Sequence, residues 1–454
     1  MCNLKKAVGG GIFVKGRFIF CTALIIVIVL FFGKPKYSVI NSFDSEINEP
    51  LGIRLMNNWN MLDSRGTAFQ TLINNFNAAN PDIKVVNFNV PEKNYITRLK
   101  VDFCSGHEPD IFVMHPGRNS VQFIQNGLIA PLNSELLADE QWFNSIDKST
   151  LQYLSHDGNI YAIPFEIVFS GLFVNTDILE ECGASVPTTF DEFKDCVRRI
   201  SAHGIIPVAF NTTSDGLLLY QMLSAFDGGP FYINDIRRTD GSINEHYLNG
   251  ADLCRELYDL GAFPPNAFSL SDYERNELFL RKEAAMIAQN SSFAGNIYNA
   301  SVPNRNTGLY EPADTTVKMI PFPSNSPTYL LYGVGGNAFF ASSDAWQNPQ
   351  KHNAALKFLK YITSAAAVAE FSETAPTISA VKFVEHNKTY NPLMINLREV
   401  LSSPVAFLEF PETFVDGDIW ADFSAGFPGI LSGTSSAEAV WQSAFGAYYD
   451  NSGR

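Results

Sequence analysis

A strand, a helix and a second strand follow one another between residues 52 and 88, and this order limits the folds open to the chain. GIRLMNNW (52–59) has the pattern of a strand that ends in polar residues. After it, apolar residues recur at the spacing of one helical face: Phe69, Leu72, Ile73 and Phe76. Asn80 and Pro81 end this helix before the strand IKVVNF (83–88). Two strands joined through a helix predict a parallel sheet.

The same pattern recurs later in the chain. Thr189 and Glu192 predict a capping box before a helix with the apolar face Phe190, Phe193, Val197 and Ile200. The strand IIPVAFN (205–211) follows that helix, and Ser435 with Glu438 predicts the start of another helix. At 454 residues, 46% of them hydrophobic, the chain is long enough for two or three domain-sized units. We therefore predict an α/β fold with two sheets.

The N-terminus predicts export. An uncharged apolar run, FIFCTALIIVIVLFF (18–32), follows the basic residues Lys5, Lys6, Lys15 and Arg17. No Ala-x-Ala cleavage site comes after the run. We expect an uncleaved signal anchor whose N-terminus stays in the cytoplasm while the rest of the chain lies outside the cell. A cleaved signal peptide is the alternative.

Charge and cysteine content narrow the classes of partner. A net charge of -15 argues against nucleic acid or an anionic membrane surface as a partner. After the apolar run the chain has Cys104, Cys182, Cys196 and Cys254, without a CxxC pair or the spacing of a zinc site. We expect buried thiols and leave one disulfide bridge open. No metal site is predicted.

Nothing in the sequence calls for a cofactor or for catalysis. Gly333, Gly335 and Ala338 match the spacing of a dinucleotide fingerprint, but a strand-like segment follows where that motif needs a helix. The chain contains no P-loop, no GxSxG and no HExxH. A glycosidase would need two facing carboxylates, and the sequence leaves such a pair open. We expect a binding protein with no catalytic residues and no cofactor.

Several segments, in this order, resemble the extracellular solute-binding proteins of sugar ABC importers, the cluster that includes maltose-binding protein. They are NPDIKV (80–85), GHEPDIFV (106–113), NGLIAPLN (126–133), DGNIYAIPFEIVFSGLFVNTDIL (157–179), VPTTFDEFKDCVRRISAHGIIPVAF (186–210), AAMIAQNSSF (284–293), GGNAFFAS (335–342) and ILSGTSSAEAVW (430–441). The resemblance covers nearly everything after residue 50. It implies two α/β lobes joined by crossing strands, with the ligand held between them.

The resemblance also implies where the lobes begin and end. Residues 1–45 would be the cytoplasmic segment, the anchor and a tether. Lobe one would take 46–163 and about 331–375, and lobe two 164–330 and about 376–454. The segment 157–179 resembles the first crossing, so Glu166 and Phe169 would lie at the floor of the cleft. Glu166 either binds ligand hydroxyls or is a hinge residue that is solvated or in a salt bridge.

The remaining candidates come from strand ends, where open α/β sheets bind ligands, and from the family landmarks. A sugar presents an apolar face that suits an aromatic ring and hydroxyls that suit polar side chains. Trp59 is either an aromatic platform in the cleft or packs against the helix that follows it. Tyr332 and Thr377 would lie on the other crossings. The other candidates are Asn58, Asp63, His115, Arg118, Asn211, Asp215, Asn290, Ser291 and Phe293.

We expect a monomeric surface receptor that holds a mono- or oligosaccharide between its lobes and docks on an ABC permease. The alternative hypothesis is a binding protein of the same fold that holds a non-sugar solute, such as a polyamine, a phosphate ester or a peptide. An extracellular carbohydrate-active enzyme and a receptor that signals to a sensor protein remain as further alternatives. A cleft lined with charges of one sign would favour the non-sugar solute.

Overall fold

The computed structural model describes residues 49–452, except 60–63, 91, 117, 230–234, 304–309, 313–315, 325–328, 335–337, 376, 383–391 and 403–405. All described helices and strands belong to one compact unit, Leu51–Arg454. The predicted anchor run, 18–32, lies outside the described residues. Among the described helices, none has the length and apolar character that crossing a bilayer requires.

The first sheet has the strand order β2-β1-β3-β14-β6. Its strands are β1 (Leu51–Asn57), β2 (Ile83–Asn89), β3 (Ile111–Met114), β6 (Ala162–Pro164) and β14 (Ala338–Ala341). β1 is parallel to β2 and β3, while β14 is antiparallel to β3 and to β6. The predicted strand–helix–strand unit is therefore confirmed, and the carboxyl ends of β1, β2, β3 and β6 lie at one edge.

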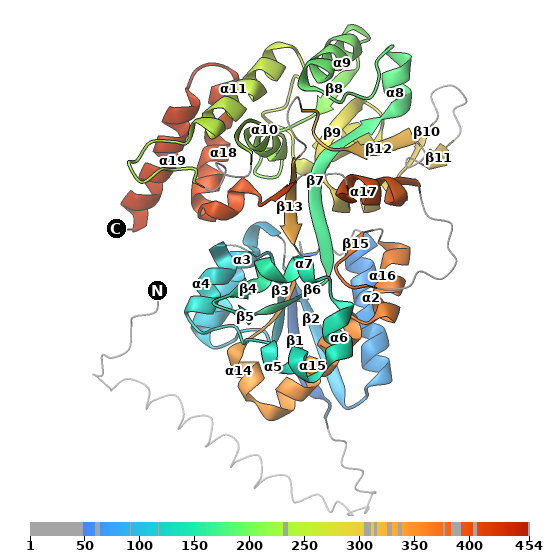
Figure 1. The fold of residues 1–454 in the computed structure, drawn as a ribbon, viewed down its shortest axis with the longest axis vertical. Helices are drawn as coiled ribbons and strands as arrows, with labels where there is room; N and C mark the ends of the chain where they lie inside the picture. Colours follow the sequence, from blue (N-terminus) through green and yellow to red (C-terminus); the bar gives the residue numbers. More distant parts are fainter. Residues whose placement is uncertain are drawn as a thin grey trace, which may run out of the picture. The chain divides into compact units, whose positions relative to one another are not determined.

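Helices cover both faces of this sheet, as the lower half of Figure 1 shows. They are α2 (Ser64–Ala79), α3 (Glu92–Ser105), α4 (Arg118–Gln125), α5 (Asn133–Ala138), α6 (Glu140–Ser145), α7 (Lys148–Leu151), α14 (Ser343–Gln347), α15 (Pro349–Ile362) and α16 (Ala365–Thr374). The apolar stripe predicted on α2 is buried together with residues of α15 and α16. On the other face, Tyr95, Leu99 and Phe123 of α3 and α4 pack against Met56 and Phe112.

The second sheet has the strand order β16-β13-β7-β9-β8, and β12 and β15 also pair with β7. Its strands are β7 (Glu166–Asn175), β8 (Ile206–Ala209), β9 (Ala284–Asn290), β12 (Val317–Ile320), β13 (Tyr329–Val334), β15 (Ile378–Ser379) and β16 (Ala406–Leu408). β7 is antiparallel to β9 and β13, whereas β8 is parallel to β9 and β16 is parallel to β13. The carboxyl ends of β8, β9, β13 and β16 therefore share the edge at which β7 begins.

The helices of this second layer are α8 (Thr176–Glu181), α9 (Phe190–Ala202), α10 (Leu218–Gly228), α11 (Glu245–Asp259), α12 (Asp272–Leu280), α13 (Ala294–Asn299), α17 (Pro392–Ser402), α18 (Gly417–Leu431) and α19 (Ala437–Ser452). The predicted capping box of Thr189 and Glu192 is confirmed at the start of α9. The cap predicted at Ser435 is off by one residue, because the Ser436 hydroxyl accepts from the amide of Ala439. Short hairpins β4–β5 (Ser155–His156, Asn159–Ile160) and β10–β11 (Ser301–Pro303, Tyr310–Pro312) complete the fold.

Strand β7 is central to the second sheet, and every one of its residues is buried. Gly171 lies where β7 meets β12, and a Cβ atom there would come within 2.7 Å of the Ile320 carbonyl oxygen. Only a glycine allows the two backbones to approach so closely. Figure 1 shows β7 running from the first sheet into the second.

Candidate functional site

The polar ends of the two sheets face each other at the start of β7. A single residue, Phe165, separates the last residue of β6 from the first residue of β7. β6 ends at the carboxyl edge of the first sheet, and β7 begins at the carboxyl edge of the second. In addition, α2 lies against α13, and α4 lies against the short helix η4 (Pro411–Phe414). This arrangement places the residues that follow both sets of strands in one region.

Glu166 is the buried charge of this region, with a fully buried side chain. Its Oε1 accepts a hydrogen bond from Arg65 Nη1 at 3.2 Å, and its Oε2 accepts one from Thr377 Oγ1 at 3.0 Å. Arg65 is in the first turn of α2, whereas Thr377 lies between α16 and β15. Three segments that are distant in sequence therefore meet at one carboxylate. The guanidinium balances the charge that burial would otherwise make unfavourable.

Arg65 was not among the predicted site residues, although the sequence carries a signal for it. A cation in the first turn of a helix faces the positive end of the helix dipole, so this position is unfavourable unless an anion compensates it. Glu166 supplies that anion from 101 residues away. The sequence also proposed a salt-bridged hinge role for Glu166, and the pair with Arg65 has this character.

The turn after β1 is held by side-chain amides. Asn57 is fully buried, and its Oδ1 accepts from the Trp59 amide at 3.0 Å and from Asn89 Nδ2 at 2.8 Å. Asn89 also donates to the Trp59 carbonyl, and Asn57 donates to Asn87. These bonds tie the ends of β1 and β2 together and fix the backbone that leads to Asn58 and Trp59.

Trp59 takes the packing role that the sequence had offered as its alternative. The side chain is 2% exposed, and its ring centroid is 4.2 Å from that of Phe69 on the following helix. Phe165, Phe339 and Phe371 surround the same indole. Its apolar faces are thus occupied by protein rings, because the core of the first layer reaches the sheet edge at this point.

The other first-layer candidates lie at the same edge. Asn58 is partly buried beside Trp59, and His115 is exposed directly after β3. Arg118 is the first residue of α4, and Asp63 lies outside the described residues. The topology therefore brings Asn58 and His115 to the edge near Glu166, as the strand-end argument predicts.

In the second layer, Asn211 makes internal hydrogen bonds. Its Nδ2 donates to the Leu270 carbonyl and to Asp272 Oδ1, and its Oδ1 accepts from Thr213 Oγ1 and Arg275 Nη1, all at 3.0–3.2 Å. The full capacity of the amide is therefore used. Asn211 organises the loop after β8 instead of presenting a free amide to a ligand. Asp215, in the same loop, is exposed.

Arg275 is the buried cation of this cluster, at 2% exposure, and it lies 3.4 Å from Asp272. Desolvation lowers the pKa of its guanidinium, while the nearby charges of Asp272 and Asp215 act in the opposite direction. The cluster joins α12 to the loop after β8. It therefore fixes the position of the loop in which Asp215 lies.

The candidates near β9 divide into core and edge residues. Phe169 is fully buried, and Phe293 packs against Phe173 with ring centroids 5.8 Å apart, so these two phenyl groups belong to the core. Ser291 Oγ accepts from the Phe169 amide at 3.3 Å. Tyr332 of β13 pairs with Phe169 on the opposite side of β7. Asn290 pairs with Ser170, and its side-chain oxygen is buried without a hydrogen-bond partner in the described structure.

The described residues include no group of three or more His, Cys, Asp or Glu side chains arranged to hold a metal ion. Gly333 lies in strand β13, and Ala338 is the first residue of strand β14. The weak dinucleotide fingerprint therefore leads into a strand and not into a helix. The cysteines at 104, 182, 196 and 254 are free thiols.

Residues 62–369 match the family model described as bacterial extracellular solute-binding protein. The chain belongs to this family. It is therefore a solute-binding protein with the two-lobe fold and an extracytoplasmic location, and not an enzyme. Below, the layer built on the first sheet is called lobe one, and the layer built on the second sheet is called lobe two.

Some similar proteins are named as sugar-binding proteins, and others, from Brucella species, as sn-glycerol-3-phosphate-binding periplasmic proteins. The multiple sugar-binding protein of Streptococcus mutans is 24% identical over 352 residues, which cover 73% of this chain and 76% of the relative. The melibiose/raffinose/stachyose-binding protein MelE of Bacillus subtilis is 21% identical over 342 residues, 72% of this chain and 74% of the relative. A solved chitin oligosaccharide binding protein aligns with a TM-score of 0.76 and 20% identity, over 87% of this chain and 97% of its own.

Proposed function

We propose that this protein binds a mono- or oligosaccharide between its two lobes and delivers it to an ABC permease in the membrane. The named relatives that bind sugars support this ligand class, since they align along most of their own length. The carboxylate of Glu166, held at the junction of the lobes, is the observation that carries the proposal. A carboxylate is a strong hydrogen-bond acceptor for ligand hydroxyls, and the guanidinium of Arg65 keeps its local charge balanced.

The same observation supports a hinge at this junction. Phe165 links β6 to β7, residues 335–337 link β13 to β14, and residues 375–377 link α16 to β15. We infer lobe boundaries near 165, 335–337 and 375–377 from these links. Closure around a ligand would require small dihedral changes at Phe165. Of the predicted residues, Asn58, His115, Glu166, Asn290 and Ser291 then line the interlobe site.

The remaining parts of the proposal concern the membrane. The apolar run 18–32 would serve as a signal anchor, and residues 33–48 would connect it to the folded unit. Such a tether keeps the receptor close to its permease, which raises its effective concentration there. We propose that the receptor works as a monomer.

A thermal-shift screen tests the ligand class. The purified full-length protein would be heated with raffinose, melibiose, maltose, xylobiose or chitotriose, and with spermidine, glycerol 3-phosphate and amino acids as controls. A ligand present at a hundredfold excess over its dissociation constant stabilises the fold by about 2.7 kcal/mol. We expect at least one sugar to raise the unfolding temperature and the controls to leave it unchanged.

The compound that raises the unfolding temperature decides between a saccharide and a charged solute as the ligand. Stabilisation by spermidine or glycerol 3-phosphate, with no response to any sugar, would replace the saccharide by a charged solute. A sugar response that survives Glu166→Gln with unchanged affinity would remove Glu166 from the ligand contacts. Loss of the sugar response in Glu166→Gln, in a variant that still unfolds cooperatively, would support both the ligand class and its site.

A further inference from the structure

Glu409 is a carboxylate without a compensating partner. It directly follows β16, and its side chain is partly buried. Burial alone raises the pKa of this carboxyl, with no contribution from a neighbouring charge or hydrogen bond. The residues that the structure describes offer it no ion pair and no hydrogen bond. An ionised carboxylate that is partly buried and has no partner destabilises the folded protein, so this position calls for a functional explanation.

The strand register places Glu409 at the interlobe edge. β16 runs parallel to β13, and Leu331 pairs with Leu408. Glu409 and Tyr332 are the next residues of the two chains after this pair, and Tyr332 itself pairs with Phe169 of β7. Because Leu408 packs in the core of lobe two, strand alternation turns Glu409 toward the opposite face of the sheet. Phe169 lies on that opposite face, in a buried cluster that contains residues of both lobes.

The segment that follows Glu409 comes close to lobe one. Helix η4 begins at Pro411 and lies against α4, which belongs to the first layer. The next acid, Glu412, is already engaged, because its Oε2 accepts from Gln221 Nε2 at 3.3 Å. Of these two neighbouring carboxylates, Glu409 is thus the one left open at the place where the lobes approach.

A second unsatisfied acceptor lies at the same edge of the sheet. The buried Oδ1 of Asn290 accepts no hydrogen bond in the part of the chain that is described. Asn290 is the last residue of β9, which pairs with β7 on the side opposite β13 and ends at the same edge of the sheet. Both groups need hydrogen-bond donors. Hydroxyl groups supply donors without adding negative charge, whereas a phosphate would be repelled by the Glu409 carboxylate.

We propose that Glu409 is a ligand-binding residue of lobe two, whose carboxylate accepts hydrogen bonds from hydroxyl groups of the solute. This inference deepens the proposed function and rests on it for the ligand class. Glu166 would bind from the hinge, and Glu409 from the far side of β13. The two carboxylates would bind different hydroxyl groups of one ligand.

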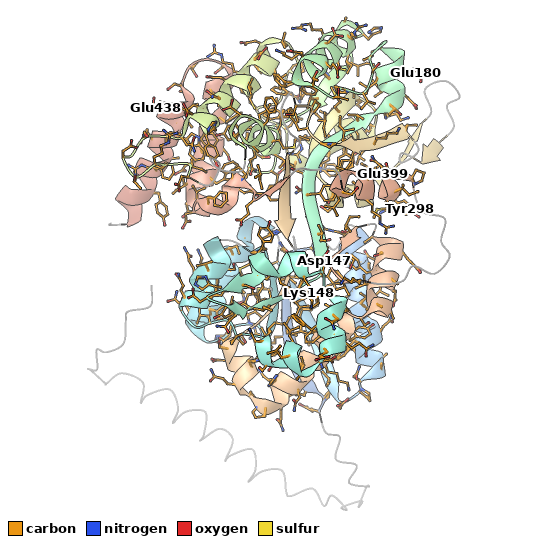
Figure 2. The ribbon with its side chains drawn as sticks, in the orientation of Figure 1. Asp147, Lys148, Glu180, Tyr298, Glu399 and Glu438 are labelled. Atoms are coloured by element: carbon orange, nitrogen blue, oxygen red, sulfur yellow. The ribbon has the colours of Figure 1, made fainter. Side chains whose placement is uncertain are left out.

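The test compares Glu409→Gln with the wild-type protein in two measurements. In calorimetric titrations with the sugar that gives the largest thermal shift, the variant should bind about tenfold to a hundredfold more weakly, because a charged acceptor is lost. In thermal unfolding without ligand, the variant should unfold at a higher temperature, because it has no carboxylate to desolvate. Glu180→Gln is the control, since Glu180 is exposed on α8 (labelled in Figure 2).

Two results would overturn the proposal: unchanged sugar affinity in Glu409→Gln, or a lower unfolding temperature of this variant without ligand. If no sugar binds the wild-type protein, the saccharide assignment fails on its own. Thermal unfolding of Glu409→Gln without ligand then still tests whether the carboxylate of Glu409 is unsatisfied in the folded protein. A higher unfolding temperature in Glu409→Gln, with no change in Glu180→Gln, would support an unsatisfied binding carboxylate, and a lower one would assign it a structural role.

Discussion

Arg65 Nη1 lies 3.2 Å from Glu166 Oε1 and joins the first helix of lobe one to the strand that enters lobe two. The carboxylate is fully buried, and the arginine side chain is 20% exposed. Because 101 residues separate the two partners, this contact depends on the tertiary fold and on the relation of the lobes. It makes the hinge region sensitive to changes in either residue.

Replacing Arg65 by alanine should destabilise the protein, because it removes the guanidinium that pairs with the buried Glu166 carboxylate. We expect a loss of about 2–4 kcal/mol in the free energy of unfolding. This is somewhat less than the loss caused by removing one partner of a fully buried ion pair, because Arg65 is partly exposed. Urea unfolding measures this loss. Arg281→Ala breaks an exposed ion pair with Glu277 and should change stability by less than about 0.5 kcal/mol. Equal effects of the two substitutions would contradict a special role for Arg65.

Local patterns in the sequence predicted the elements well. The helix at 64–79 with its buried stripe, and the capping box at Thr189, depend on residues three or four positions apart, and short-range rules cover such spacings. The cap at Ser435 was misplaced by one residue because Ser436, next to it, can make the same bond. Neighbouring serines cannot be distinguished by composition alone.

The site was harder to predict, because its contacts join distant segments. The strand-end argument placed Asn58 and His115 at one edge, and the family resemblance placed Glu166 at the cleft floor. Packing of Trp59 against the following helix was one of two alternatives, but the contact with Phe371, which lies more than 300 residues away, could not be foreseen. Glu409 was missed, although it interrupts an apolar stretch, AFLEF (406–410), much as Glu166 interrupts FEIVF (165–169). An acid among aromatic residues is thus a signal that occurs twice in this chain.

Trp59→Ala tests the packing role of this indole. Loss of a buried tryptophan should reduce the free energy of unfolding by about 3–5 kcal/mol. The affinity for ligand, measured on the folded fraction at low temperature, should change less than threefold, because the ring faces are covered by phenylalanines. A large loss of sugar affinity in Trp59→Phe, a variant that keeps most of the packing, would restore the platform interpretation.

Gly216→Ala tests how firmly the loop after β8 is fixed. A Cβ atom at this position would overlap the side-chain oxygen of Asn211 and lie 2.8 Å from its Cγ. Asn211 cannot turn away without breaking its bonds to Asp272 and Arg275. We expect a loss of about 1–3 kcal/mol in urea unfolding. Gly446→Ala is the matched control: it lies in α19 with no atom within 4 Å of the new methyl group, and it should stabilise the helix by up to about 1 kcal/mol.

The four cysteines of the folded unit should differ in reactivity. Cys104 is exposed, whereas Cys182, Cys196 and Cys254 are buried. Burial raises the pKa of the Cys196 thiol to about 11, and burial also raises that of Cys254, so little thiolate forms near neutral pH. Brief alkylation followed by peptide mass mapping should label Cys104 first and the buried three only after denaturation. Labelling of Cys196 as fast as Cys104 would mean that α9 opens readily.

The pH dependence of stability should reveal the carboxyl of Glu409. Its pKa is raised in the folded state, so the unfolded chain ionises first as pH increases. Below the ordinary pKa both states are neutral and the wild-type protein carries no penalty. Stability is then lost as pH rises through the folded pKa.

The difference in unfolding free energy between Glu409→Gln and the wild-type protein should therefore be close to zero at the acidic end of a titration and grow in favour of the variant toward neutral pH. Urea unfolding at a series of pH values measures it, with Glu180→Gln, at an exposed position of α8, as the matched control. A difference that is constant with pH would mean that Glu409 ionises as freely in the folded protein as in the unfolded chain. In that case ligand hydroxyls would not be needed to compensate its burial.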